Sequence, residues 1–162
     1  MNSSKLVKLL EISMIWAVVI IFFAGAYYLS SQNGIATFNL TNPFATKLAN
    51  LLHNGKASAK QIYDINMMLR KAGHLGVYFL LSIVLCNAFC ITNHLINHNV
   101  NMLLISIITL CILSAFAFYD EWHKQFIPGR HMTLSEAGLN IVGVVIGIVV
   151  MNGVRKLIMY FH

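Results

Sequence analysis

The chain has 162 residues, of which 58% are hydrophobic and only 10% are charged, and its formal net charge is +6. Soluble domains carry about 25% charged residues, so this composition excludes a soluble globular protein and predicts an integral membrane protein with a single domain, residues 1–162. The basic residues lie at chain ends and in loops, which favours membrane lipids as partners and argues against nucleic acid.

The first predicted transmembrane helix is an uncharged run over residues 12–29, which follows Lys5 and Lys8. Its length matches the about 20 residues that cross a hydrocarbon core. A signal peptide has the same order of basic and apolar segments, but its apolar region has only about 7–15 residues. Tyr27 and Tyr28 are typical of a membrane interface. We therefore expect a helix that is retained.

One or two short interfacial helices are predicted between the first and second spans. The first starts at the turn marked by Asn42–Pro43 and ends at Asn54–Gly55. The second starts at a capping box formed by Ser58 and Gln61 and runs to Leu69. Apolar residues recur at helical spacing in both segments, so we expect these helices to lie along the membrane surface.

Three further apolar runs predict transmembrane helices over residues 73–91, 102–119 and 137–154. The predicted fold class is therefore all-α, a polytopic protein of the cell membrane with four transmembrane helices and both termini on one side. Lys and Arg are more numerous on the loop side, which favours external termini, whereas the two lysines before the first span favour the opposite arrangement. We expect cytoplasmic termini and an extracellular segment 120–136.

Polar residues gather between the third and fourth spans, and ionisable groups at a membrane boundary are costly unless they are paired. On the fourth span, Glu136, Asn140, Gly143 and Gly147 are spaced by four, three and four residues and share one face. The spacing Gly143-x-x-x-Gly147 lets another helix approach closely. We expect this face to line a seam between two helices.

The second span carries a matching polar face, formed by Lys71, His74 and Tyr78. We expect the two faces to pack together, with Asp120 and Glu121 at the end of the third span completing the site.

A turn at Pro128–Gly129 is predicted to fold Arg130 back toward Glu121 and Glu136. Charged residues at helix ends also anchor helices in the membrane or join loops by salt bridges. For any one of these residues, such a structural role is the simpler interpretation. Because the whole set is arranged on matched faces, we favour a functional site.

The three cysteines, Cys86, Cys90 and Cys111, lie in apolar segments and are expected to act as small hydrophobic residues. Their spacing matches no metal-ligand pattern, so no metal site is predicted, and no cofactor is assigned.

Two spaced motifs span about residues 66–147. The first, N-x-x-x-R-K-x-x-H-x-x-x-Y, is matched by Asn66, Arg70, Lys71, His74 and Tyr78. The second, D-E-x-H-Q-x-F-x-P-G-R with a later acidic residue, asparagine and spaced glycines, is matched by Asp120, Glu121, His123, Phe126, Pro128, Gly129, Arg130, Glu136, Asn140, Gly143 and Gly147. In these motifs the chain resembles the VanZ-like membrane proteins, whose founding members are associated with teicoplanin resistance in Gram-positive bacteria. Lys124 and Glu136 stand where that family has glutamine and aspartate.

The resemblance implies a role in the cell envelope, with glycopeptide (teicoplanin) tolerance as one outcome. A binding protein is our first hypothesis: Arg70, Lys71, Lys124 and Arg130 would hold the anionic headgroup of a lipid or of a lipid-linked cell-wall precursor, since the guanidinium fork matches phosphate. A glycopeptide is a further candidate partner. The predicted binding residues are Arg70, Lys71, His74, Tyr78, Asp120, Glu121, His123, Arg130, Glu136 and Asn140.

A membrane enzyme is the alternative hypothesis, with His74 or Glu121 as general base and Arg130 as the group that stabilises transition-state charge. The sequence contains no nucleophile motif, so whether a reaction is catalysed stays open. A transporter is less consistent with the sequence, because four helices are few and no internal repeat is evident.

Overall fold

The computed structural model describes residues 3–96 and 100–161. The described residues form five α-helices and no strand: α1 (Ser3–Ser30), α2 (Gly34–Leu52), α3 (Ala59–Leu95), α4 (Met102–Lys124) and α5 (Leu134–Phe161). α1, α3, α4 and most of α5 are long and apolar enough to cross a membrane. The predicted all-α architecture with four transmembrane helices is therefore confirmed, and it fits a multi-pass membrane protein.

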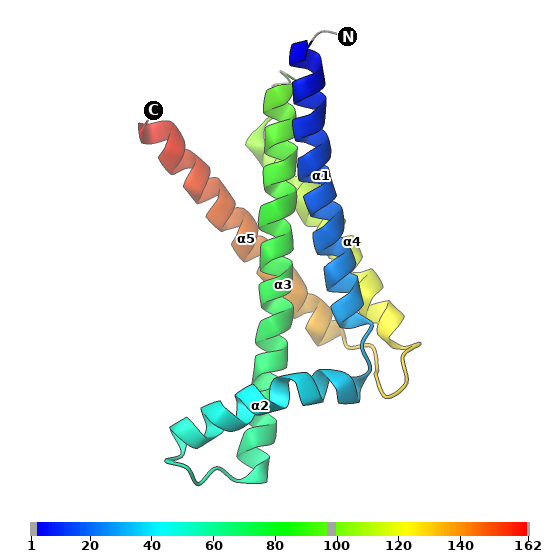
Figure 1. The fold of residues 1–162 in the computed structure, drawn as a ribbon, viewed down its shortest axis with the longest axis vertical. Coiled ribbons are helices and arrows are strands. Elements are labelled where there is room, and N and C mark those ends of the chain that lie inside the picture. Colours follow the sequence, from blue (N-terminus) through cyan, green and yellow to red (C-terminus); the bar gives the residue numbers. More distant parts are fainter. Residues whose placement is uncertain (1–2, 97–99, 162) are drawn as a thin grey trace.

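α3 is the central helix of the molecule, since it contacts each of the other four helices. α1 and α4 run along it, whereas α5 crosses it obliquely and diverges from it toward the C-terminus (Figure 1). Both termini lie at the same end of the bundle (Figure 1). The apolar core is small, with Leu81, Leu113 and Val144 at its centre, and many large apolar side chains on the outer faces are exposed. This distribution is expected of helices whose surroundings are lipid.

The second predicted interfacial helix is wrong, because α3 runs without a break from Ala59 to Leu95. The segment Ser58–Leu69 forms the start of this long helix instead. Its capping box is confirmed: the backbone N–H of Gln61 donates to the Ser58 hydroxyl at 3.3 Å, and the Ser58 N–H donates to the Gln61 side chain at 2.8 Å. The helix continues because the residues that join the two predicted segments are good helix formers.

α2 corresponds to the first helix expected at the membrane surface, and it starts at Gly34, nine residues before the predicted start at Pro43. The Asn33 side chain caps its first turn. Pro43 lies inside the helix, where proline removes a backbone donor and disturbs the preceding turn. In that turn, the Asn66 side chain of α3 donates to the Phe38 carbonyl at 3.2 Å. This contact joins α2 to α3, which it crosses transversely (Figure 1).

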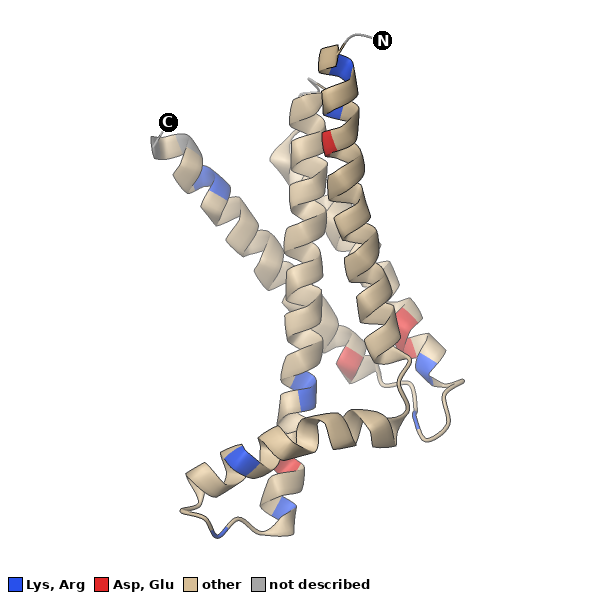
Figure 2. Ribbon diagram, in the orientation of Figure 1, with Lys and Arg blue, Asp and Glu red and all other residues tan. Residues whose placement is uncertain are grey.

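The charged residues lie mainly toward the two ends of the bundle, and the middle of the long helices is uncharged (Figure 2). At the end where α2 lies, charged residues occur on α3, on the last turns of α4 and on the first turn of α5 (Figure 2). α4 extends past the predicted span to Lys124, so Asp120 and Glu121 belong to its last turns. The predicted site residues are thus held mostly on helices, and Arg130 lies in the irregular connection from Gln125 to Thr133.

Candidate functional site at the end of the bundle

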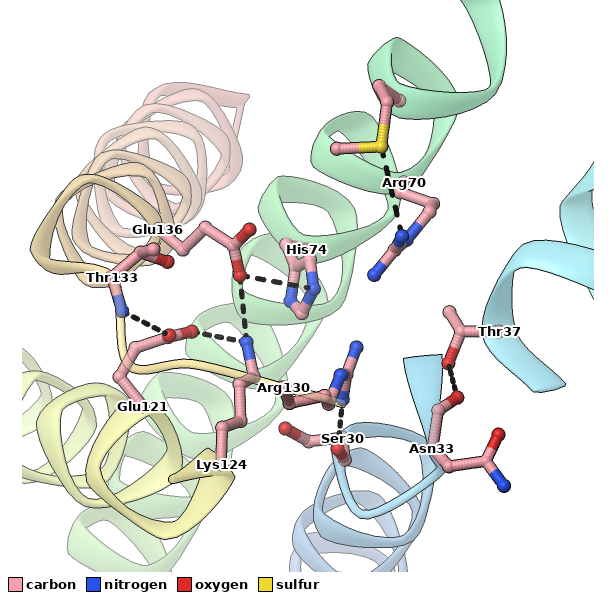
Figure 3. Close-up of polar contacts among 11 residues, drawn as sticks. Ser30, Asn33, Thr37, Arg70, His74, Glu121, Lys124, Arg130, Thr133 and Glu136 are labelled. Atoms are coloured by element: carbon pink, nitrogen blue, oxygen red, sulfur yellow. Dashed lines mark hydrogen bonds and ion pairs between the residues drawn. The ribbon is translucent and has the colours of Figure 1, made fainter. Parts of the chain in front are cut away.

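A buried ionic network joins α4 to α5. The Lys124 ammonium group donates to Glu121 and, at 3.0 Å, to Glu136 (Figure 3). The side chains of Lys124 and Glu121 are 2% and 0% exposed, and that of Glu136 is 26% exposed. The backbone N–H of Thr133 approaches the second Glu121 oxygen at 3.5 Å. Buried charges are tolerated only when they are paired and hydrogen-bonded, which is the case here.

His74 of α3 borders this network, with its Nε2 4.0 Å from the Glu136 carboxylate (Figure 3). The close packing of α3 against α5 places it there. A Cβ atom on Gly143 would lie 2.5 Å from the Leu75 carbonyl oxygen, and one on Gly147 would lie 2.6 Å from the Phe79 carbonyl oxygen. The two glycines therefore allow the backbones of α3 and α5 to touch, as the spacing predicts.

Arg130 connects the loop after α4 to the end of α1. The loop turns at Gly129, whose φ of 75° favours glycine, and the Arg130 guanidinium donates to the carbonyl of Ser30 (Figure 3). Ser30 is the last residue of α1, where carbonyl groups lack helical partners and the helix dipole attracts a cation. Burial, assisted by the positive charge of Arg70, lowers the pKa of Arg130 below its usual value, and nearby carboxylates oppose this shift. The guanidinium stays charged at any physiological pH.

A cavity of about 160 Å³ opens between α1, α2 and α3 beside this network. Its polar lining comes from Ser30, Thr37, Thr41, Arg70, His74, Tyr78, Asp120 and Arg130. The guanidinium groups of Arg70 and Arg130 point toward this space from opposite sides (Figure 3). Two arginines and one carboxylate leave the lining with an excess of one positive charge.

Several buried polar atoms around this cavity make no hydrogen bond with any residue that the structure describes. They are the Ser30 hydroxyl, the Tyr78 hydroxyl, one Asp120 oxygen and Nε of Arg70. Buried polar atoms in proteins are nearly always bonded to protein or to an ordered molecule. The Asp120 carboxylate lies beside the Ser30 and Tyr78 hydroxyls and interacts with both, so these three groups partly satisfy one another. Nε of Arg70 keeps its capacity for a polar ligand or for water.

The structure brings together most of the predicted site residues, in two groups. His74, Glu121 and Glu136 belong to the ionic network, and Arg70, His74, Tyr78, Asp120 and Arg130 line the cavity. Asn140 lies fully buried on α5 and both its amide atoms lack a partner among the described residues. His123 lies apart, where its ring nitrogen bonds the Tyr27 hydroxyl of α1 at 3.0 Å.

Three expectations differ from the structure. Lys71 is exposed, so it does not line the cavity. Lys124 is enclosed by two carboxylates and is not available to a ligand. Glu121 pairs with Lys124, and Arg130 bonds Ser30, so the expected contact between Glu121 and Arg130 is not made. The physical reason is that the last turn of α4 places Lys124 three residues from Glu121, whereas the loop carries Arg130 outward to the end of α1.

Sequence reasoning missed Ser30, Thr37 and Thr41 as parts of the site. Tyr27 was interpreted as an interfacial aromatic residue, and in the structure it also bonds to His123. None of these four residues belongs to the two motifs. They come close to the site residues of α3 and α4 only in the folded structure. Among the described residues, no three His, Cys, Asp or Glu side chains gather as metal ligands.

Comparisons of this chain with protein-family models, with curated proteins and with solved structures found no match.

Proposed function

We propose that the cavity between α1, α2 and α3 binds an anionic group, and that Arg70 and Arg130 hold it. The observation that carries this proposal is that two guanidinium groups from different elements face one cavity whose lining holds a single carboxylate. Planar guanidinium groups bind phosphate through two parallel hydrogen bonds, which makes arginine well suited to this role. The hydroxyls of Ser30 and Tyr78 also line the cavity, beside Asp120, and supply further hydrogen bonds when they turn toward the anion.

The anion is proposed to be the headgroup phosphate of a lipid or of a lipid-linked cell-wall precursor. The remaining walls of the cavity are apolar, with Ala26 and Leu29 from α1 and Leu69 and Val77 from α3. A free phosphate ion gains nothing from such walls, whereas an acyl or polyprenyl chain buries apolar surface against them. The cavity is lined by Leu29 and Ser30 at the end of α1 and by Asp120 in the last turns of α4. A membrane that covers the apolar stretches of these helices would have its headgroups at this level.

The two motifs support a further part of the proposal, that the protein is a VanZ-like member of the cell envelope and contributes to glycopeptide (teicoplanin) tolerance. Binding of a lipid-linked precursor, or of the glycopeptide itself, accounts for such a role without a chemical reaction. In this proposal the termini are cytoplasmic, and the cavity opens toward the outer face, where cell-wall precursors are assembled.

Arg70 and Lys71 provide a matched pair for testing the binding site, because they are neighbours on α3 but only Arg70 lines the cavity. In nanodiscs that contain a polyprenyl phosphate, Arg70→Gln should weaken binding about 10–100-fold, the effect of losing about 1.5–3 kcal/mol from hydrogen bonds to a charged group. Lys71→Gln should leave the affinity within about twofold. Native mass spectrometry measures the retained lipid in each variant, and equal retention in both variants would refute the site.

An enzyme is the second candidate function, favoured by the position of His74. Its imidazole lines the cavity and lies 4.0 Å from Glu136, a carboxylate able to orient a general base. Glu121, the other candidate base, is fully buried and bonded to Lys124, so the enzyme hypothesis now rests on His74 and Arg130. If lipid is converted, His74→Gln should abolish turnover while lipid retention persists. If the wild-type protein forms no product, the enzyme hypothesis is refuted and only the binding function remains.

A further inference from the structure

A second side-chain cluster lies toward the opposite end of the bundle, near the two termini, and contains four sulfur atoms. Cys86 and Cys90 are one turn apart on α3 and are 0% and 4% exposed. Their side chains form one buried cluster with Met102, the first residue of α4, and with Met151 of α5. We call these four residues the sulfur cluster. Three helices therefore bring sulfur atoms to one place.

The packing of the sulfur cluster leaves two thiols and a thioether close enough to share one ion. Sγ of Cys90 lies 3.6 Å from Sδ of Met102, and Cys86, one turn earlier on α3, packs in the same buried cluster. Three sulfur atoms that surround one ion at about 2.3 Å lie about 4.0 Å from each other. The Cys90–Met102 separation is about 0.4 Å shorter, so a small outward shift of the two side chains would admit an ion.

Arg155 of α5 supplies a positive charge beside this cluster. Its guanidinium lies 4.0 Å from Sδ of Met102 and 3.3 Å from the Asn87 side-chain oxygen, and its charge acts on both thiols. Nε of Arg155 is buried without a partner, and no carboxylate among the described residues pairs with this arginine. A cavity of about 330 Å³ is lined by Met102, Met151 and Arg155.

We propose that the sulfur cluster is a binding site for a monovalent soft metal ion, Cu(I), with Cys86, Cys90 and Met102 as ligands. Thiolate and thioether ligands select Cu(I), and the apolar side chains that pack around the two thiols are Phe89, Met102, Ile105 and Met151. On binding, each of the two thiols releases its proton to solvent, so that two thiolates and one Cu(I) ion carry a net charge of −1. Arg155 neutralises that charge. A divalent ion such as Zn(II) would leave the arginine uncompensated in a partly buried place, which disfavours it.

Cu(I) affinity is the property to measure, with the full-length reduced protein in detergent, free of oxygen, competing against bicinchoninate. We expect one ion per chain. Cys86→Ser and Cys90→Ser should each weaken binding by at least about 100-fold, and Met102→Leu and Arg155→Gln by about 10-fold. The matched controls are Cys111→Ser, an exposed thiol on α4, and Lys156→Gln, the exposed neighbour of Arg155; both should bind within about twofold of wild type.

Proton release provides a second measurement that does not depend on how the variants fold. Wild-type protein should release about two protons per Cu(I) ion, because thiol ligands must be deprotonated, whereas Met102→Leu and Arg155→Gln keep both thiols and should release the same number. The proposal is overturned if fewer than one proton is released, if Cys111→Ser weakens binding as much as Cys90→Ser, or if equimolar Zn(II) displaces the copper. X-ray absorption should detect only sulfur atoms in the first coordination shell, and nitrogen or oxygen ligands would refute it.

Discussion

Lys124 is the residue on which the buried ionic network depends. It lies between the carboxylates of Glu121 and Glu136, with only 2% of its side chain exposed. The motif of the proposed VanZ-like family has glutamine at this position, which hydrogen-bonds a carboxylate but carries no charge. In this chain a glutamate lies on each side of the position, and the Lys124 ammonium group pairs with both carboxylates at once. The charge of Lys124 is therefore matched to that of Glu121 and Glu136.

Replacement of Lys124 by glutamine should destabilise the protein by about 3 kcal/mol, because it leaves the buried Glu121 carboxylate and the partly exposed Glu136 carboxylate without a cation. Denaturant titration of the purified protein in detergent measures this change. Lys47→Gln removes an exposed lysine from α2 and should change the free energy of unfolding by no more than about 0.5 kcal/mol. If the two variants unfold at the same denaturant concentration, the network does not stabilise the fold.

At the scale of elements, the seam between α3 and α5 decides where His74 and Glu136 meet. Gly143 and Gly147 lie against the backbone of α3, whereas a Cβ atom on Gly153, farther along α5, would meet nothing within 4 Å. The same amino acid on one helix therefore has two roles. At the seam it permits close approach of two backbones, and near the C-terminus it has no such neighbour.

Gly143→Ala should force α5 away from α3 and destabilise the protein by about 1–3 kcal/mol, the usual cost of overpacking. Gly153→Ala adds the same methyl group in open space and should be neutral or stabilising by up to about 1 kcal/mol, because alanine favours helix. Thermal unfolding in detergent compares the two variants. A Gly143→Ala protein as stable as wild type would show that the seam adapts without cost.

At the scale of the whole molecule, the arrangement of the helices places the cavity at one end and the sulfur cluster toward the other. Four spans put both termini on the same side as the sulfur cluster (Figure 1). The proposed topology then has the cavity on the outer face of the membrane and the termini in the cytoplasm. The proposal of this orientation rests on Lys5 and Lys8 before the first span, and the larger number of Lys and Arg on the loop side favours the reverse.

A single cysteine at Met132 tests this orientation, since Met132 is exposed in the loop between α4 and α5. With Cys86, Cys90 and Cys111 replaced, Met132→Cys should react with a membrane-impermeant maleimide in intact cells. Lys156→Cys, at the opposite end of α5, is the matched control and should react only after lysis. The reverse pattern would place the termini outside and the cavity in the cytoplasm.

The sequence by itself determined the helical spans, because a segment in lipid must satisfy its own backbone hydrogen bonds and bury no charge. It also determined the glycine seam and the turn before Arg130, which depend on local spacing and on the backbone freedom of glycine. The continuity of α3 through Arg70 was not predicted. The change from polar to apolar residues there resembled a boundary between two helices, although the backbone has no reason to stop.

Only the tertiary structure decided which charges pair. Glu121 had several cations within ten residues along the chain, and the choice of Lys124 over Arg130 depends on the path of the loop. Arg130 finds its partner at Ser30, one hundred residues earlier, because the unsatisfied end of α1 lies beside that loop. The cavity and the sulfur cluster likewise combine residues from three or more elements. Such sites are set by long-range packing, for which periodicity along a single helix holds no information.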